Sequence, residues 1–301
     1  MGRRSSLGSW MVLFRAGNAV TGIFGVLLGA VLATQGIPSG EKALITALHC
    51  VSVMTFMFGW NAVNDLLDVE IDRINRPERP LPSAEITISA ARTGVAITGA
   101  LSLSSIFCAG YLAHNGDTGI EGWAPAPLIW AAAILLMFNY ESSSRFSMRL
   151  KDRGLPGNVA ISMSVGMVIL FGAAGVSRPF DSRAWAIFII GFTYNLAREI
   201  VKDIEDMHGD KGRETLAMQA GPERARTVSW MILLVSLALV LLPFSQGIFP
   251  KPHLILVIPS VIALLMVKQR LFAAEDHAAQ MMIKRSMQLC LGAFLVSSLA
   301  Q

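Results

Sequence analysis

The sequence NAVNDLLDVEIDRINRPERPLP, Asn61–Pro82, follows a long apolar run. It carries three aspartates in the pattern DxxDxxxD, at Asp65, Asp68 and Asp72. Together with Asn61, these aspartates would share one face of a continuous helix. Carboxylates this close repel one another, and near a bilayer they are costly unless they are paired or hold a cation. We call this stretch the first acidic stretch, and it predicts a cation site at the end of a helix.

A second acidic stretch, REIVKDIEDMHGDKGRETL at residues 198–216, also follows an apolar run. Its three aspartates repeat the DxxDxxxD pattern, at Asp203, Asp206 and Asp210. Each lies at the same offset along the chain from its counterpart in the first acidic stretch, and Asn195 and Glu199 extend the same helical face. A solvated surface would not need this identical spacing. The two stretches therefore predict two halves of one polyvalent metal site at a membrane surface.

The composition is that of a polytopic membrane protein. Of the 301 residues, 53% are hydrophobic and 15% are charged, whereas about 25% are charged in soluble domains. Apolar windows of about 20 residues, the length that spans a bilayer, occur at roughly 11–34, 43–66, 86–112, 124–142, 158–177, 184–203, 227–246, 252–270 and 280–300. We therefore expect an all-α fold, a single domain over residues 1–301 with nine transmembrane helices.

The distribution of Lys and Arg predicts how these spans are oriented. Basic residues gather in the N-terminal region and in the loops after the second, fourth, sixth and eighth spans, whereas the other side carries only Lys42, Arg178, Arg183 and Lys251. We expect the N-terminus and both acidic stretches in the cytoplasm and the C-terminus outside. The acidic stretches end the second and sixth spans, which favours two four-helix repeats followed by a ninth helix. Because topology explains the basic residues, no nucleic-acid partner is expected.

Magnesium is the cation that this pattern favours. Mg²⁺ takes oxygen ligands, keeps several waters and commonly shares substrate phosphates, so the aspartates predict a diphosphate held through Mg²⁺. Basic residues flank both acidic stretches, at Arg76, Arg79, Arg198, Lys202 and Lys211. Cations in such positions contact phosphate oxygens and stabilise a departing diphosphate.

The two acidic stretches together resemble the signatures of the UbiA superfamily of intramembrane prenyltransferases. NDLLDVEIDRINRPERPLPS resembles the first signature, KDIEDMHGDKGRETL resembles the second, and Arg15-Ala16-Gly17-Asn18 matches an RxxN element in the first helix. The resemblance covers the whole chain in order. It implies that the nine helices form a bundle around a central cavity open sideways to lipid, and that a prenyl diphosphate binds there through Mg²⁺.

Candidate site residues follow from the charges and the resemblance together. The candidate catalytic and metal-binding residues are Asp65, Asp68, Asp72, Asp203, Asp206 and Asp210. The candidate substrate-binding residues are Arg15, Asn18, Asn61, Asn64, Arg76, Arg79, Lys151, Asn158, Arg198, Lys202 and Lys211. The family often has a tyrosine five residues before the lysine that Lys151 matches, where this chain has Phe146, and Tyr140 lies nearby.

The resemblance implies electrophilic alkylation, with several acceptors left open. The run REIVKDIED is most similar to the archaeal lipid branch of the family, whose members transfer a geranylgeranyl group to the hydroxyl of geranylgeranylglyceryl phosphate in membrane ether-lipid synthesis. An acceptor phosphate would give Arg145, Arg149 and Lys151 a partner. The alternative within the family is an aromatic acceptor of quinone, tocopherol-like or chlorophyll-type synthesis. An ion-coupled transporter is an alternative from another class, although carboxylates gathered at one membrane face argue against it.

Overall fold

The computed structural model describes residues 5–142, 144, 146–207 and 214–300, and every regular element among them is a helix. The all-α prediction is confirmed. In chain order the helices are α1 (Ser6–Leu13), α2 (Ala16–Thr34), α3 (Gly40–Leu67), α4 (Val69–Asn75), α5 (Ile88–Asn115), α6 (Ile120–Trp123), α7 (Pro125–Glu141), η1 (Leu150–Asp152), α8 (Leu155–Gly175), α9 (Ser182–Asp206), α10 (Leu216–Ala220), α11 (Pro222–Ser245), η2 (Lys251–His253), α12 (Leu254–Phe272) and α13 (Asp276–Leu299).

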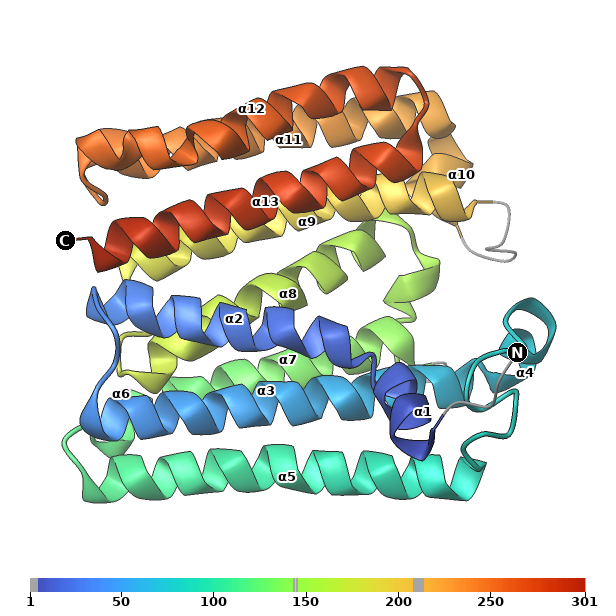
Figure 1. Cartoon of the computed structure of the whole chain (residues 1–301), viewed down its shortest axis with the longest axis horizontal. Helices are drawn as coiled ribbons and strands as arrows, with labels where there is room; N and C mark the ends of the chain where they lie inside the picture. The colour runs from blue at the N-terminus through green and yellow to red at the C-terminus, as the bar shows by residue number, and fades with distance from the viewer. Residues whose placement is uncertain (1–4, 143, 145, 208–213, 301) are drawn as a thin grey trace.

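Within the described part of the chain, eight segments are long and apolar enough to cross a membrane. They match the first eight predicted spans, and they are α2, α3, α5, α6 with α7, α8, α9, α11, and η2 with α12. The ninth predicted span is α13, which runs the length of the bundle (Figure 1) but carries Asp276, Lys284 and Arg285 in its first half. The chain is an integral, multi-pass membrane protein whose last, more polar helix packs against α9 and α12.

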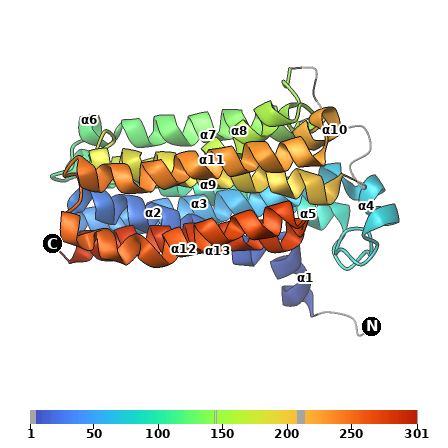
Figure 2. The ribbon, with the colours of Figure 1, turned by 90° about the horizontal axis from the view of Figure 1, so that it is seen from above.

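The long helices form a bundle in which α5 lies at one edge and α11 and α12 lie at the other (Figure 1). Between these edges, α3 packs on α5, α2 packs on α8, and α9 packs on α8, α11 and α13. Seen from above, the long helices follow the long axis of the molecule (Figure 2). The central helices α8 and α9 are the more buried ones, because they are covered on several sides.

Helices α2 and α8 approach so closely that glycine is required at their contact. A Cβ atom on Gly29 would lie 1.9 Å from the carbonyl oxygen of Ile169, and one on Gly172 would lie 2.1 Å from the carbonyl oxygen of Val26. Small residues allow this backbone-to-backbone packing in membrane bundles. The contact fixes α2, and with it the start of the chain, against the centre of the bundle.

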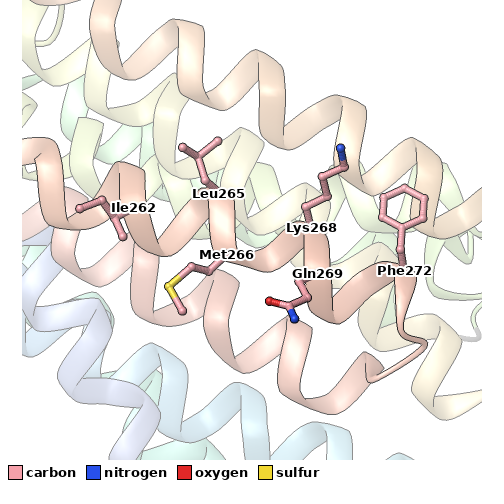
Figure 3. A pocket seen from close by; sticks show the side chains of 6 residues that line it. All are labelled: Ile262, Leu265, Met266, Lys268, Gln269 and Phe272. Atoms are coloured by element: carbon pink, nitrogen blue, oxygen red, sulfur yellow. The ribbon is translucent and has the colours of Figure 1, made fainter.

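Apolar side chains also cover the outer surface, as expected for a protein surrounded by lipid. An open groove of about 550 Å³ runs along the outside of α12 (Figure 3). It is lined by Ile262, Leu265, Met266, Lys268, Gln269 and Phe272. Since all these side chains come from one helix, the groove is a feature of the outer surface of the bundle.

The described residues of both acidic stretches lie at the same end of the bundle, which we call the site end. Helix α3 finishes there at Leu67, α9 finishes there at Asp206, and the short helices α1, α4 and α10 gather there (Figures 1 and 2). The basic residues expected on the other side lie at the opposite end, at the starts of α3, α9 and η2 and in the turn before α9. The described parts of the two stretches thus lie at one end of the bundle, whereas their shared metal site stays a prediction.

Candidate active site

The first acidic stretch is not one continuous helix. Helix α3 ends at Leu67, and Asp68 stands between α3 and α4 with φ of −91° and ψ of 6°. Aspartate favours helix ends over helix interiors because its side chain competes for backbone hydrogen bonds. The prediction that Asn61, Asp65, Asp68 and Asp72 share the face of one helix is therefore wrong beyond Asp68.

Arg79 lies between two buried aspartates, one on each side of the helix break, and pairs with both. Its Nη1 atom donates to Asp65 Oδ1 at 3.2 Å and to Asp72 Oδ2 at 2.5 Å. The side chains of Asp65 and Asp72 are only 6% and 7% exposed. A second cation, Arg15, donates from Nη2 to Asp65 Oδ1 at 2.7 Å. Buried carboxylates need such partners, so two cations balance two aspartates here.

Arg15 reaches the site because the chain breaks sharply between α1 and α2. Its φ is 47°, in the left-handed region that few residues other than glycine adopt. Asn61 holds this break, since its Nδ2 donates to the Phe14 carbonyl oxygen at 3.1 Å. Asn18 is exposed, and within the described residues its side chain does not join the network. Of the RxxN element, the arginine is thus the member that meets the aspartates.

A second group of contacts surrounds Lys151 in η1. Its Nζ atom lies 2.5 Å from Glu141 Oε1 and 3.5 Å from Asp68 Oδ2. Glu141 also accepts a hydrogen bond from Asn64 Nδ2, while Asn64 Oδ1 lies 3.4 Å from Arg15 Nη2. The sequence did not predict Glu141, because it lies in neither acidic stretch. Its only signal was a carboxylate as the last residue of a long apolar run.

The second acidic stretch contributes Asp203 and Asp206 from the end of α9. Asp203 is half-buried and accepts a hydrogen bond from Nδ2 of Asn158, in α8, at 2.9 Å. Asp206 is exposed and is the last residue of α9. The predicted residues Asp210 and Lys211 lie outside the described residues. Asn158 therefore lies against Asp203, and its predicted role in substrate binding stays a prediction.

The remaining predicted cations lie at the site end with other partners or at its surface. Arg198 donates from Nη1 to Glu199 Oε1 at 3.0 Å, and Lys202 Nζ lies 3.4 Å from Glu199 Oε2. Arg198 also keeps a buried Nε–H that has no hydrogen-bond partner among the described residues. Arg76 is exposed at the end of α4. Contacts of these three with a diphosphate stay predictions.

One short connection carries a contact to each acidic stretch. Lys151 in η1 reaches toward Asp68, and Asn158 in the first turn of α8 bonds to Asp203. The segment between them is packed tightly, since a Cβ atom on Gly157 would lie 2.3 Å from the Leu150 carbonyl oxygen. The two stretches are therefore positioned relative to one another through η1 and the start of α8.

The site combines carboxylates with cations, and this pairing favours an anionic ligand that brings a metal ion with it. Among the described residues, no three Asp, Glu, His or Cys side chains form a ready-made metal cluster. Instead, Arg79 lies between Asp65 and Asp72, and Lys151 lies between Asp68 and Glu141. Guanidinium and ammonium groups at such a place bind phosphate oxygens well.

A family model for the UbiA prenyltransferase family matches residues 22–290. The chain belongs to that family. This UbiA-family enzyme, a prenyltransferase, is 32% identical over 297 residues to the digeranylgeranylglyceryl phosphate synthase of Methanopyrus kandleri, covering 97% of this chain and 99% of the relative. The family assignment excludes the transporter alternative as the explanation of the intramembrane carboxylates.

Solved structures share the fold of this UbiA-family chain. A structure that gives insight into digeranylgeranylglyceryl phosphate synthase in membranes superposes with a TM-score of 0.76 at 25% identity, covering 98% of this chain and 99% of the other. A UbiA homologue from Archaeoglobus fulgidus, bound to DMAPP and Mg²⁺, superposes with a TM-score of 0.65 at 17% identity, covering 95% of this chain and 99% of the other. The bundle, including α13, is thus the UbiA fold.

Proposed function

We propose that this prenyltransferase transfers a geranylgeranyl group from its diphosphate to the hydroxyl of geranylgeranylglyceryl phosphate. The observation that carries the proposal is the convergence of Arg15, Arg79 and Lys151 on the carboxylates of the first acidic stretch. Such a mixed cluster suits a diphosphate together with its counter-ion. The donor and acceptor are those expected from the synthase of Methanopyrus kandleri, a relative that matches nearly the full length of the chain.

The residues present fit a magnesium ion. Asp65, Asp68 and Asp72 face the site with oxygen donors, the ligands that Mg²⁺ prefers, and Asp203 and Asp206 offer the same chemistry from α9. The side chain of Asp68 is 33% exposed, so a hydrated ion has access to it. The Archaeoglobus homologue bound to Mg²⁺ and DMAPP supports this assignment. When bound, the ion would neutralise charge on the departing diphosphate.

The basic side chains would act on the donor. Arg15, Arg79 and Lys151 would donate hydrogen bonds to phosphate oxygens while the allylic C–O bond breaks and its electron pair leaves with the diphosphate. The hydroxyl oxygen of the acceptor then forms the new C–O bond to the allylic carbon and releases its proton. The apolar helices around the site exclude water, which would otherwise capture the allylic cation.

The acceptor phosphate requires cations beyond those that hold the donor. Arg149 and Arg153 flank η1 on either side of Lys151, and both are exposed. They are available to a second phosphate near the donor. This supports an acceptor that carries a phosphate. Arg145, expected to take part, lies outside the described residues.

We further propose that the site end faces the cytoplasm. Most described basic side chains belong to this end, whereas Lys42, Arg178, Arg183 and Lys251 lie at the other. The positive-inside rule then places the active site and the N-terminus in the cytoplasm and the end of α13 outside.

Product analysis tests the proposed function. Purified protein with Mg²⁺ and geranylgeranyl diphosphate should convert geranylgeranylglyceryl phosphate into the diether, and EDTA should abolish the conversion. Asp65→Asn and Asp203→Asn should each lower the rate by roughly 100-fold or more, whereas Asp117→Asn, in the turn between α5 and α6, should not. Alkylation of 4-hydroxybenzoate instead of the lipid phosphate would overturn the acceptor, and no product with either acceptor would overturn the reaction.

A further inference from the structure

Glu141 is a buried carboxylate at the site that neither acidic stretch contains. It is the last residue of α7, and its side chain is 5% exposed. Its Oε1 atom accepts hydrogen bonds from both Lys151 Nζ, at 2.5 Å, and Asn64 Nδ2. These two partners come from η1 and α3, so Glu141 joins three elements of the site end at one oxygen atom.

This position is unfavourable for a carboxylate unless something compensates. The C-terminus of a helix carries partial negative charge, so an acidic side chain in the last turn of α7 is repelled. Burial adds a desolvation penalty, which an ion pair with good hydrogen bonds offsets. Lys151 and Asn64 supply that compensation here. A local rule broken and then compensated at a site is typical of a functional requirement.

The hydrogen bonds of Glu141 also fix how Asn64 is oriented. A carboxylate oxygen accepts only, so it must face the amide NH₂ group of Asn64. The carbonyl oxygen Oδ1 of Asn64 is then turned toward Arg15, whose Nη2 lies 3.4 Å away. Glu141 therefore acts on two cations at once, on Lys151 directly and on Arg15 through Asn64.

The distances around Lys151 show which acid determines its place. Lys151 Nζ lies 2.5 Å from Glu141 and 3.5 Å from Asp68. A lysine side chain is long and flexible, and ordering it has an entropic cost of up to about 2 kcal/mol. The Glu141 contact removes that freedom before a ligand arrives. Asp68, which is more exposed, stays open to other partners.

We propose that Glu141 is a positioning residue that sets Lys151 and Asn64 for the diphosphate of the donor. The proposal rests on the donor assignment of the proposed function. It does not depend on the acceptor. Glu141 acts through Lys151 and Asn64, so its removal weakens donor binding and leaves the chemical step largely intact once the donor is bound.

The test measures donor binding in Glu141→Gln, Glu141→Ala, Lys151→Ala and the double variant Glu141→Ala/Lys151→Ala. The probe is geranylgeranyl thiolodiphosphate, an unreactive donor analogue, with Mg²⁺, and steady-state kinetics give KM and kcat. The matched control is Glu41→Gln, an acid at the start of α3 that bonds to the Asp117 and Thr118 N–H groups at the opposite end.

Glu141→Ala should raise the Kd of the analogue and the KM for the donor roughly tenfold or more. Glu141→Gln keeps an oxygen acceptor of the same shape and should recover much of this loss. In the Lys151→Ala background, the removal of Glu141 should raise the Kd less than it does in the wild type, because only its contact with Asn64 is then left to lose. The control should match the wild type. Since Gln is isosteric with Glu, its variant is informative even if Glu141→Ala does not fold.

Three results would overturn the positioning role. One is wild-type binding by Glu141→Ala. Another is a double variant whose loss is the product of the two single losses. The third is a fall in kcat for Glu141→Gln at unchanged Kd, which would make Glu141 a proton acceptor instead. A wrong acceptor assignment leaves analogue binding untouched, whereas a wild-type protein that does not bind the analogue would overturn the donor assignment as well.

Discussion

Replacing Arg79 by alanine should destabilise the folded protein as well as impair donor binding. The side chain is 19% exposed and pairs with two aspartates that are almost fully buried. After the substitution, Asp65 keeps Arg15 at 2.7 Å. Asp72 loses the only side-chain partner that the structure gives it among the described residues. The stability loss should therefore come mainly from Asp72.

The magnitude follows from that uncompensated charge. Removing one partner of a buried ion pair costs about 3–5 kcal/mol. In a protein of this size, 1 kcal/mol lowers Tm by about 2–4 °C. We expect Arg79→Ala to lower Tm by roughly 6 °C or more. Because the cost lies in the charge of Asp72, Asp72→Asn in the Arg79→Ala background should recover a large part of it.

Thermal unfolding in one detergent, followed by intrinsic fluorescence, provides the assay. The matched control is Arg73→Ala, which removes an arginine from an ion pair within α4, the helix that also carries Asp72. Arg73 and its partner Glu70 are 56% and 74% exposed, so this loss should be below about 1 kcal/mol. The argument from a buried uncompensated charge is refuted if Arg79→Ala has the same Tm as Arg73→Ala. It is also refuted if Asp72→Asn does not raise the Tm in the Arg79→Ala background.

Two further predictions concern the frame of the bundle. Trp123→Phe should lower stability by about 1–3 kcal/mol, because buried His49 Nε2 loses the indole N–H that donates to it at 3.1 Å, and an unchanged Tm would contradict this. Gly172→Ala should cost about 1–3 kcal/mol or more, since its Cβ would lie 2.1 Å from the Val26 carbonyl oxygen. Gly99→Ala, with open space around it, should be neutral or slightly stabilising, and equal effects of the two alanines would refute the close-packing argument.

The order of the long helices followed from hydropathy, whereas their ends and the short helices α1, α4, α6 and α10 did not. The fifth span was expected to begin at residue 158, whereas α8 begins at Leu155 and takes in Pro156 and Gly157. Proline is tolerated in the first turn of a helix, where its missing N–H is not needed. The last span was expected to match the others, yet α13 is more polar because its first half lies at the site end.

The site was predictable where its residues are close in sequence or repeat a pattern. The aspartates and Arg79 fall into this class, since spacing and charge alone marked them. Glu141 was not predictable, because its partner Asn64 lies 77 residues away in the sequence and Glu141 belongs to no motif. The break at Asp68 also escaped prediction, since helical spacing continues through it. Tertiary contacts, rather than local pattern, decide both.

The segment from Lys151 to Asn158 has an architectural consequence. It sets the distance between the two acidic stretches, because its two ends contact Asp68 and Asp203. One added residue within the first turn of α8 would rotate everything upstream by about 100° around the helix axis relative to Asn158. Lys151 would then swing away while Asn158 kept its partner. Insertions should be tolerated in the turns at the end of the bundle opposite the site end. An insertion between Lys151 and Asn158 should instead disrupt one of the two contacts.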